Sequence, residues 1–122
     1  MTTVLIADDE QSLRLLVSAT MMSDEYEVVE ASDGDEAWEL LRQYRPRVAL
    51  LDVQMPGRTG LELTHEIRSD PELAKTFVVL LTSKAQQADI QAGLAVGADR
   101  YLTKPFSPLE LLTIVEQAVA RA

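Results

Sequence analysis

Three short and nearly continuous apolar runs constrain the fold of this chain more than any other feature of its sequence. The longer stretches between them have apolar residues at helical spacing. Continuous apolar runs of this length are typical of strands that are covered on both faces, as in a parallel sheet flanked by helices. The three predicted inner strands are Val4–Ala7, Val48–Leu51 and Phe77–Leu81.

Two more polar segments, Tyr26–Ala31 and Arg100–Thr103, are predicted to be strands at the edges of the same sheet. Helical patterns alternate with the strands along the chain. Right-handed crossovers between parallel strands then give a doubly wound α/β fold with helices on both faces. The five predicted helices are Gln11–Met22, Asp35–Tyr44, Gly60–Ser69, Ala85–Val96 and Pro108–Ala120.

Three of these helices begin with the spacing of a capping box, in which a Ser or Thr precedes a Glu or Gln by three residues. The pairs are Thr59 with Glu62, Ser107 with Glu110 and, in a weaker version, Ser83 with Gln86. Trp38, Met21 and Met22 fall at helical spacing among apolar residues and are interpreted as core residues.

The composition limits the classes of function. The chain has 122 residues, which fits one domain of common size. Twenty acidic residues against eleven basic ones give a formal net charge of -9, which opposes binding to nucleic-acid phosphates or anionic membrane surfaces. There is no cysteine, no N-terminal signal pattern and no apolar run near the roughly 20 residues that cross a bilayer. We therefore expect a cytoplasmic domain without direct contacts to nucleic acid or membrane.

Polar side chains follow four of the predicted strands at their carboxyl ends: Asp8 and Asp9, then Asp52, Thr82 and Lys104. In doubly wound sheets, ligand sites form at this edge where the strand order reverses. If the first and third strands are neighbours, the carboxylates converge, and each pair at 4 Å repels by about 4 kcal/mol at an effective dielectric near 20. Mg²⁺ with oxygen ligands, together with Lys104, would supply the positive charge that this arrangement requires.

Each of these residues alone has a simpler explanation. Asp8 or Asp9 would also suit the N-cap of the first helix, Asp52 a turn, Thr82 an ordinary strand end and Lys104 a solvated charge. What favours a site is that all of them fall at one edge of the sheet.

Taken together, the motifs resemble the receiver domain of bacterial two-component signalling, the CheY-like response-regulator family. The resemblance covers residues 1–122 and implies a flavodoxin-like five-stranded parallel sheet in the order 2-1-3-4-5, flanked by five helices. The motifs that support it are Asp8-Asp9, Asp52 to Gly60, Leu81-Thr82-Ser83, Gly97-Ala98-Asp99 and Lys104-Pro105-Phe106.

The resemblance implies that Asp52 is the phosphoryl acceptor and that the reaction depends on Mg²⁺. Asp9, Asp52 and the backbone carbonyl of Gln54 would bind the ion directly, and Asp8 would act mainly through water. The donor would be a sensor histidine kinase or a histidine phosphotransfer protein. Such a chain catalyses its own phosphorylation and dephosphorylation, but it is primarily a signalling switch.

The resemblance also assigns the residues of the switch. Lys104 would pair with the phosphoryl oxygens, Thr82 would hydrogen-bond to them, and Tyr101 would change rotamer on activation. A cis peptide before Pro105 is implied as well. The signal would leave through the face formed by the fourth helix, the fifth strand and the fifth helix, toward a downstream partner or a fused output domain.

A wide apolar stripe on the last predicted helix supports such a contact face, since Ile114 and Ala118 add to the positions that the core needs. Rival functions fit less well. A haloacid-dehalogenase-type phosphohydrolase needs a second acid where Gln54 stands, and a flavodoxin-like nucleotide binder would not place Asp8-Asp9-Glu10 in its phosphate loop. A pure interaction module would not require the acceptor, acid pair, threonine and lysine together.

Overall fold

The computed structural model of the chain describes residues 1–83 and 87–120. Strands and helices alternate along these residues. The strands are β1 (Thr2–Ala7), β2 (Tyr26–Ala31), β3 (Val48–Asp52), β4 (Phe77–Thr82) and β5 (Arg100–Thr103). The helices are α1 (Gln11–Thr20), α2 (Gly34–Tyr44), α3 (Gly60–Ser69), α4 (Gln87–Ala95) and α5 (Pro108–Ala120). No helix among the described residues is both long and apolar enough to span a membrane.

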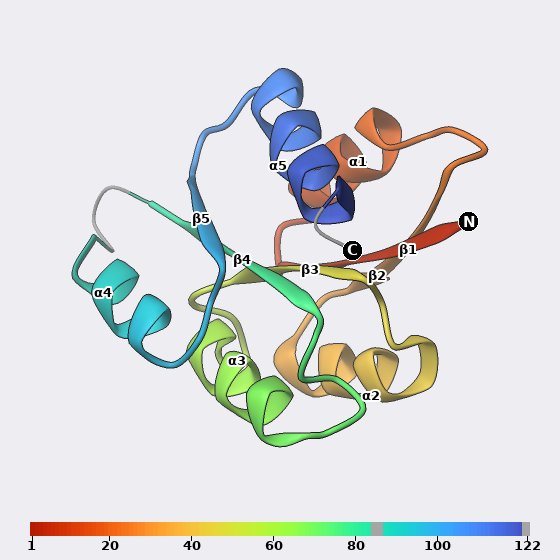
Figure 1. Cartoon of the computed structure of the whole chain (residues 1–122). Coiled ribbons are helices and arrows are strands. Elements are labelled where there is room, and N and C mark those ends of the chain that lie inside the picture. The colour runs from red at the N-terminus through yellow and green to blue at the C-terminus, as the bar shows by residue number, and fades with distance from the viewer. Residues whose placement is uncertain (84–86, 121–122) are drawn as a thin grey trace.

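All neighbouring strands are parallel and form one sheet in the order β2-β1-β3-β4-β5. Helices α1 and α5 cover one face of this sheet, and α2, α3 and α4 cover the other, as Figure 1 shows. The predicted doubly wound fold and its strand order 2-1-3-4-5 are therefore confirmed. Strand order reverses between β1 and β3, which places the predicted edge site at their carboxyl ends.

The three inner strands are buried on both faces, as their continuous apolar runs predict. Alternate residues of one strand enter different cores: Leu5 packs toward α2 and α3, whereas Ile6 packs toward α1 and α5. The same division holds in β3, where Leu51 and Leu50 lie in the two cores and are fully buried. Truncation of such a leucine to alanine typically costs about 2–5 kcal/mol of stability.

Helix ends differ from the predictions where the sequence pattern lacks a strong stop or start. Helix α1 ends at Thr20 and not at Met22; Met21 is buried, but Met22 is 81% exposed, so its interpretation as a core residue is wrong. Helix α2 begins one residue early because Asp33 caps it, accepting a hydrogen bond from the amide of Glu36.

Two of the three predicted capping boxes are confirmed. Thr59 and Glu62 exchange both capping hydrogen bonds at the start of α3, and Ser107 and Glu110 do the same at the start of α5. The third pair includes Gln86, which lies outside the described residues, as does the predicted start of α4 at residue 85.

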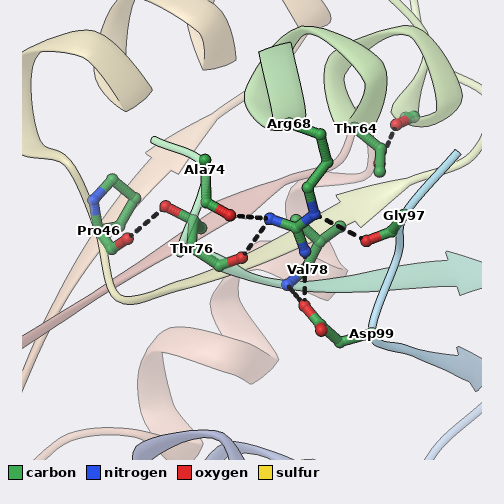
Figure 2. Close-up of polar contacts among 9 residues, drawn as sticks. Pro46, Thr64, Arg68, Ala74, Thr76, Val78, Gly97 and Asp99 are labelled. Carbon is green, nitrogen blue, oxygen red and sulfur yellow. Dashed lines mark hydrogen bonds and ion pairs between the residues drawn. The ribbon is translucent and has the colours of Figure 1, made fainter. Parts of the chain in front are cut away.

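Arg68, near the end of α3, joins three segments at the amino edge of the sheet, shown in Figure 2. Its acceptors are Gly97 O at 2.9 Å, Ala74 O at 3.0 Å, Thr76 O at 2.7 Å and Asp99 Oδ2 at 2.7 Å. Asp99 also accepts a hydrogen bond of 2.8 Å from the amide of Val78 in β4. The Arg68–Asp99 pair therefore fixes where the chain enters the short edge strand β5.

Candidate functional site

The register between β1 and β3 places two acidic residues side by side. Ala7 pairs with Leu51, so Asp8 and Asp52, each one residue further along, are neighbours at the carboxyl edge. Asp8 is fully buried and Asp52 is 4% exposed, whereas Asp9 is exposed. Oxygen atoms of these three carboxylates all lie within 4.8 Å of one another.

This cluster fits a hard divalent cation. Three carboxylate oxygens within a few ångströms are the donor set that Mg²⁺ prefers, and the exposed Asp9 leaves a side open to solvent for the waters that Mg²⁺ retains. Burial and the charge of Asp8 raise the pKa of Asp52 to about 6, although Lys104 opposes this shift. The raised pKa means that a further positive charge would be favourable here.

Lys104 faces the cluster from the end of β5. Its Nζ lies 2.7 Å from Asp8 Oδ2 and 3.4 Å from Asp52 Oδ2. Burial works against the charged ammonium, but the two carboxylates prevail and raise the pKa of Lys104, so the side chain is a permanent cation. The peptide bond between Lys104 and Pro105 is cis, as the resemblance implies.

Thr82 ends β4 beside Asp52 and is fully buried. Its hydroxyl donates a hydrogen bond of 3.3 Å to the carbonyl of Ser83. Tyr101 lies on the edge strand β5 and is 45% exposed, so it is outside the acidic cluster in this structure. Gln54 is exposed, and its amide donates a hydrogen bond of 3.3 Å to Asp52 Oδ1.

The simpler explanation of the acid pair as helix caps does not hold. The N-cap of α1 is Glu10, whose side chain makes no capping hydrogen bond. Asp8 instead accepts a hydrogen bond of 2.9 Å from the amide of Glu10, which orients its carboxylate without capping the helix.

Arg14 is a neighbour of the site that the sequence analysis missed. Its Nη1 donates a hydrogen bond of 2.6 Å to the backbone carbonyl of Asp8, and its Nε lies 3.5 Å from Glu30 Oε1. The side chain thus ties α1 to the loop after β1 and to the end of β2. Its position in the first turns of α1 was visible in the sequence, but no motif marks it.

Comparisons with known proteins agree with this geometry. The family model described as "Response regulator receiver domain" matches residues 4–116. A response regulator of Aneurinibacillus migulanus, GtcR, is 34% identical over 98% of this chain and 48% of its own length. The chain spans about half the length of the curated relatives that it matches.

Two solved structures extend the comparison. The chemotaxis response regulator CheY4 of Vibrio cholerae is 37% identical, with a TM-score of 0.89 over 97% of this chain and 98% of that one. The receiver domain of a sensor histidine kinase of Pseudomonas aeruginosa is 28% identical, with a TM-score of 0.87 over 98% of both chains, and has a magnesium ion coordinated in its active site cleft.

Proposed function

Because the chain belongs to the response regulator receiver domain family, we propose that it is a phospho-switch that accepts a phosphoryl group on Asp52 in a Mg²⁺-dependent reaction. The observation that best supports this is the convergence of Asp8, Asp9 and Lys104 around the buried carboxylate of Asp52. A nucleophile for phosphorus, ligands for a hard cation and a fixed ammonium then lie at one edge of the sheet.

Asp52 is the nucleophile in this proposal. One of its oxygens forms a bond to phosphorus while the P–N bond of a donor phosphohistidine breaks, and the imidazole leaves with the electron pair. With a pKa of about 6, the carboxyl group is mostly ionised at neutral pH and can attack. Water later attacks the same phosphorus, and hydrolysis of the acyl phosphate restores the free carboxylate.

Asp9, Asp52 and the backbone carbonyl of Gln54 would hold Mg²⁺, and Asp8 would act mainly through water. Bound Mg²⁺ supplies two positive charges that balance the charge on the phosphoryl oxygens during transfer. Lys104 provides a third charge and is held by Asp8 within 3.4 Å of Asp52, from where it can pair with a phosphoryl oxygen.

The proposed signal runs from Thr82 to Tyr101. The Thr82 hydroxyl would turn to a phosphoryl oxygen, and Tyr101 would rotate inward into the space that this movement opens. Tyr101 also lines an open groove of about 620 Å³ between β5 and α5, together with Leu109 and Ile114. This groove is the proposed output surface. Ala118 is buried, so its expected contribution to the surface is wrong.

Partners and extent are proposed on the same basis. The donor would be a sensor histidine kinase or a histidine phosphotransfer protein, and residues 1–122 would form one receiver domain in the cytoplasm. Since the curated relatives are about twice as long, the output would pass to a fused domain or to a separate protein. The domain itself would bind neither nucleic acid nor membrane, in line with its net charge of -9.

The deciding experiment is labelling with a small phosphodonor such as acetyl phosphate, followed by intact mass. The wild-type chain should gain one phosphoryl group in Mg²⁺, and Asp52→Asn should gain none while remaining folded. Equal labelling in excess chelator, or acid-labile phosphate on Asp52→Asn, would contradict the proposal.

A further inference from the structure

The segment between β3 and α3, residues 53–59, is packed tightly against the start of α2. The amide of Gly34 donates a hydrogen bond of 2.8 Å to the carbonyl of Pro56. A Cβ atom on Gly34 would collide with the backbone of Arg58, so only glycine allows this approach. Gly57 has a φ of 77°, which also favours glycine, and its Cα faces the side chain of Asp35.

Arg58 is the side chain that joins this segment to both neighbouring helices. Its Nη1 lies 2.7 Å from Asp35 Oδ1 in α2, and its Nε lies 2.9 Å from Glu66 Oε2 in α3. The guanidinium carbon also lies 5.7 Å from the ring centroid of Trp38 in α2, within the range of a cation–π contact. One side chain thus contacts three groups on two helices.

The same segment contains Gln54, whose carbonyl is the proposed third protein ligand of Mg²⁺. At its first residue the segment is held by the sheet, because the amide of Val53 donates a hydrogen bond of 3.0 Å to the carbonyl of Leu81. Toward its other end it is held by Arg58 and by the hydrogen bond from Gly34. Between these points the side chain of Met55, the residue after Gln54, is buried in the core. The backbone around Gln54 is therefore held by the sheet, by Met55 and, toward α3, by the contacts of Arg58.

We propose that Arg58 is a positioning residue for the divalent-cation site, because its contacts with Asp35, Glu66 and Trp38 hold the segment that presents the Gln54 carbonyl. This inference rests on the proposed function, since it assumes that the cluster of Asp8, Asp9 and Asp52 binds Mg²⁺. Arg58 itself does not contact those carboxylates; it acts through the backbone between residues 53 and 59.

Electrostatics and positioning predict opposite effects when Arg58 is replaced by a neutral residue. Loss of a positive charge reduces repulsion of an incoming divalent cation, so on charge alone Arg58→Met should bind Mg²⁺ slightly more tightly. Loss of the contacts that Arg58 makes with Asp35, Glu66 and Trp38 should instead weaken Mg²⁺ binding, because residues 53–59 must then become ordered when the ion binds. The direction of the change therefore separates the two roles.

The test is isothermal titration calorimetry with MgCl₂ on the whole chain. Arg58→Met should weaken binding by about fivefold, equivalent to about 1 kcal/mol. Arg58→Lys keeps the charge but lacks the planar fork that reaches two carboxylates, and it should weaken binding by about two- to threefold. Arg42→Met is the matched control: it removes an exposed arginine of α2 that makes no ion pair with the described residues, and it should bind like wild type.

Amide NMR of the metal-free variants provides a second readout. If Arg58 positions the segment, the signals of residues 54–57 should shift or broaden in Arg58→Met, whereas those of β1 should not change. Mg²⁺ binding as tight as or tighter than wild type in Arg58→Met would overturn the inference. If that variant did not fold, wild-type affinity in Arg58→Lys would overturn it equally.

A failure of the proposed function would be distinguishable. If the wild-type chain bound no Mg²⁺, the metal site and this inference would both be wrong. If the wild type bound Mg²⁺ and Asp9→Ala did not, but Arg58→Met matched the wild type, only the role of Arg58 would be wrong.

Discussion

The ammonium of Lys104 lies 2.7 Å from the buried carboxylate of Asp8, so before any phosphorylation the lysine is held by an acid that is not the proposed acceptor. The distance to Asp52 is longer, at 3.4 Å. Two buried carboxylates thus share one ammonium, and burial together with the charge of Asp8 raises the pKa of Asp52 to about 6.

The stability of the metal-free chain should depend on pH through Asp52. The folded state raises the pKa of this carboxyl from 3.8 to about 6, so it favours the protonated form. The resulting stabilisation is fully present below about pH 4 and is lost as the pH rises through about 6, at a cost of about 3 kcal/mol at most.

Asp52→Asn should therefore be more stable than wild type at about pH 7.5 in chelator, and this advantage should shrink as the pH falls to about 4. Urea unfolding of both chains across this pH range measures the difference between their free energies of unfolding. Because both chains contain the same other acids, the contributions of those acids cancel in this difference. A constant difference at all pH values would contradict the raised pKa.

Mg²⁺ should stabilise the folded chain, because the ion binds the native carboxylate cluster and relieves its repulsion. At a concentration of about 100 times the dissociation constant, the expected gain is about 2.7 kcal/mol. Asp9→Ala should lose most of the Mg²⁺-induced rise in melting temperature, whereas Asp24→Ala, an exposed acid in the loop before β2, should keep it. Equal rises in both variants would argue against a site at the carboxyl edge.

Some elements of the fold could be predicted from the sequence, and others could not. The inner strands were predictable because β1, β3 and β4 are buried on both faces, which leaves continuous apolar runs. The meeting of Asp8 with Asp52 followed from the shared edge of parallel strands. The end of α1 was not predictable, because the helical spacing of apolar residues continues through Met22, although the helix ends at Thr20 and Met22 is exposed to solvent.

The contacts of Arg14 and Arg58 could not be predicted from the sequence either. Arg14 and Arg58 contact groups from other segments of the chain, and such contacts leave no periodic pattern near the residue itself. Glu30 and Asp35, their acidic partners, likewise have no local feature that distinguishes them from other surface acids. These contacts form only in the folded structure, where the sheet brings together segments that are distant in the sequence.

The coupling of Thr82 to Tyr101 predicts that phosphorylation and signalling can be separated. Thr82→Ala should still accept a phosphoryl group, because Asp52 and Lys104 are intact, but it should shift less toward the active packing. Amide NMR of beryllofluoride-treated protein measures this shift in β5 and α4. Thr103→Ala, which changes the paired position at the end of β5, is the control. A full wild-type shift pattern in Thr82→Ala would refute the coupling.

The Arg68–Asp99 pair at the amino edge predicts a loss of stability without a loss of phosphorylation. Arg68→Met leaves the backbone carbonyls of Gly97, Ala74 and Thr76, all partly shielded from water, without the donor that Arg68 supplies. Asp99 loses its ion pair and keeps only the hydrogen bond from the amide of Val78. We expect a cost of about 2–3 kcal/mol in urea unfolding, since orphaned polar groups of this kind cost about 1–3 kcal/mol each when buried and less where water reaches them.

Arg100→Met is the control. It removes an exposed arginine at the start of β5 and should change the free energy of unfolding by less than about 0.5 kcal/mol. Because Asp52 lies at the opposite edge of the sheet, Arg68→Met should still be labelled by a phosphodonor under conditions where it is folded. Faster hydrogen exchange confined to residues 97–103 would show that the pair anchors the entry to β5. Unchanged exchange there, together with wild-type stability, would show that the four contacts of Arg68 do not hold this strand in place.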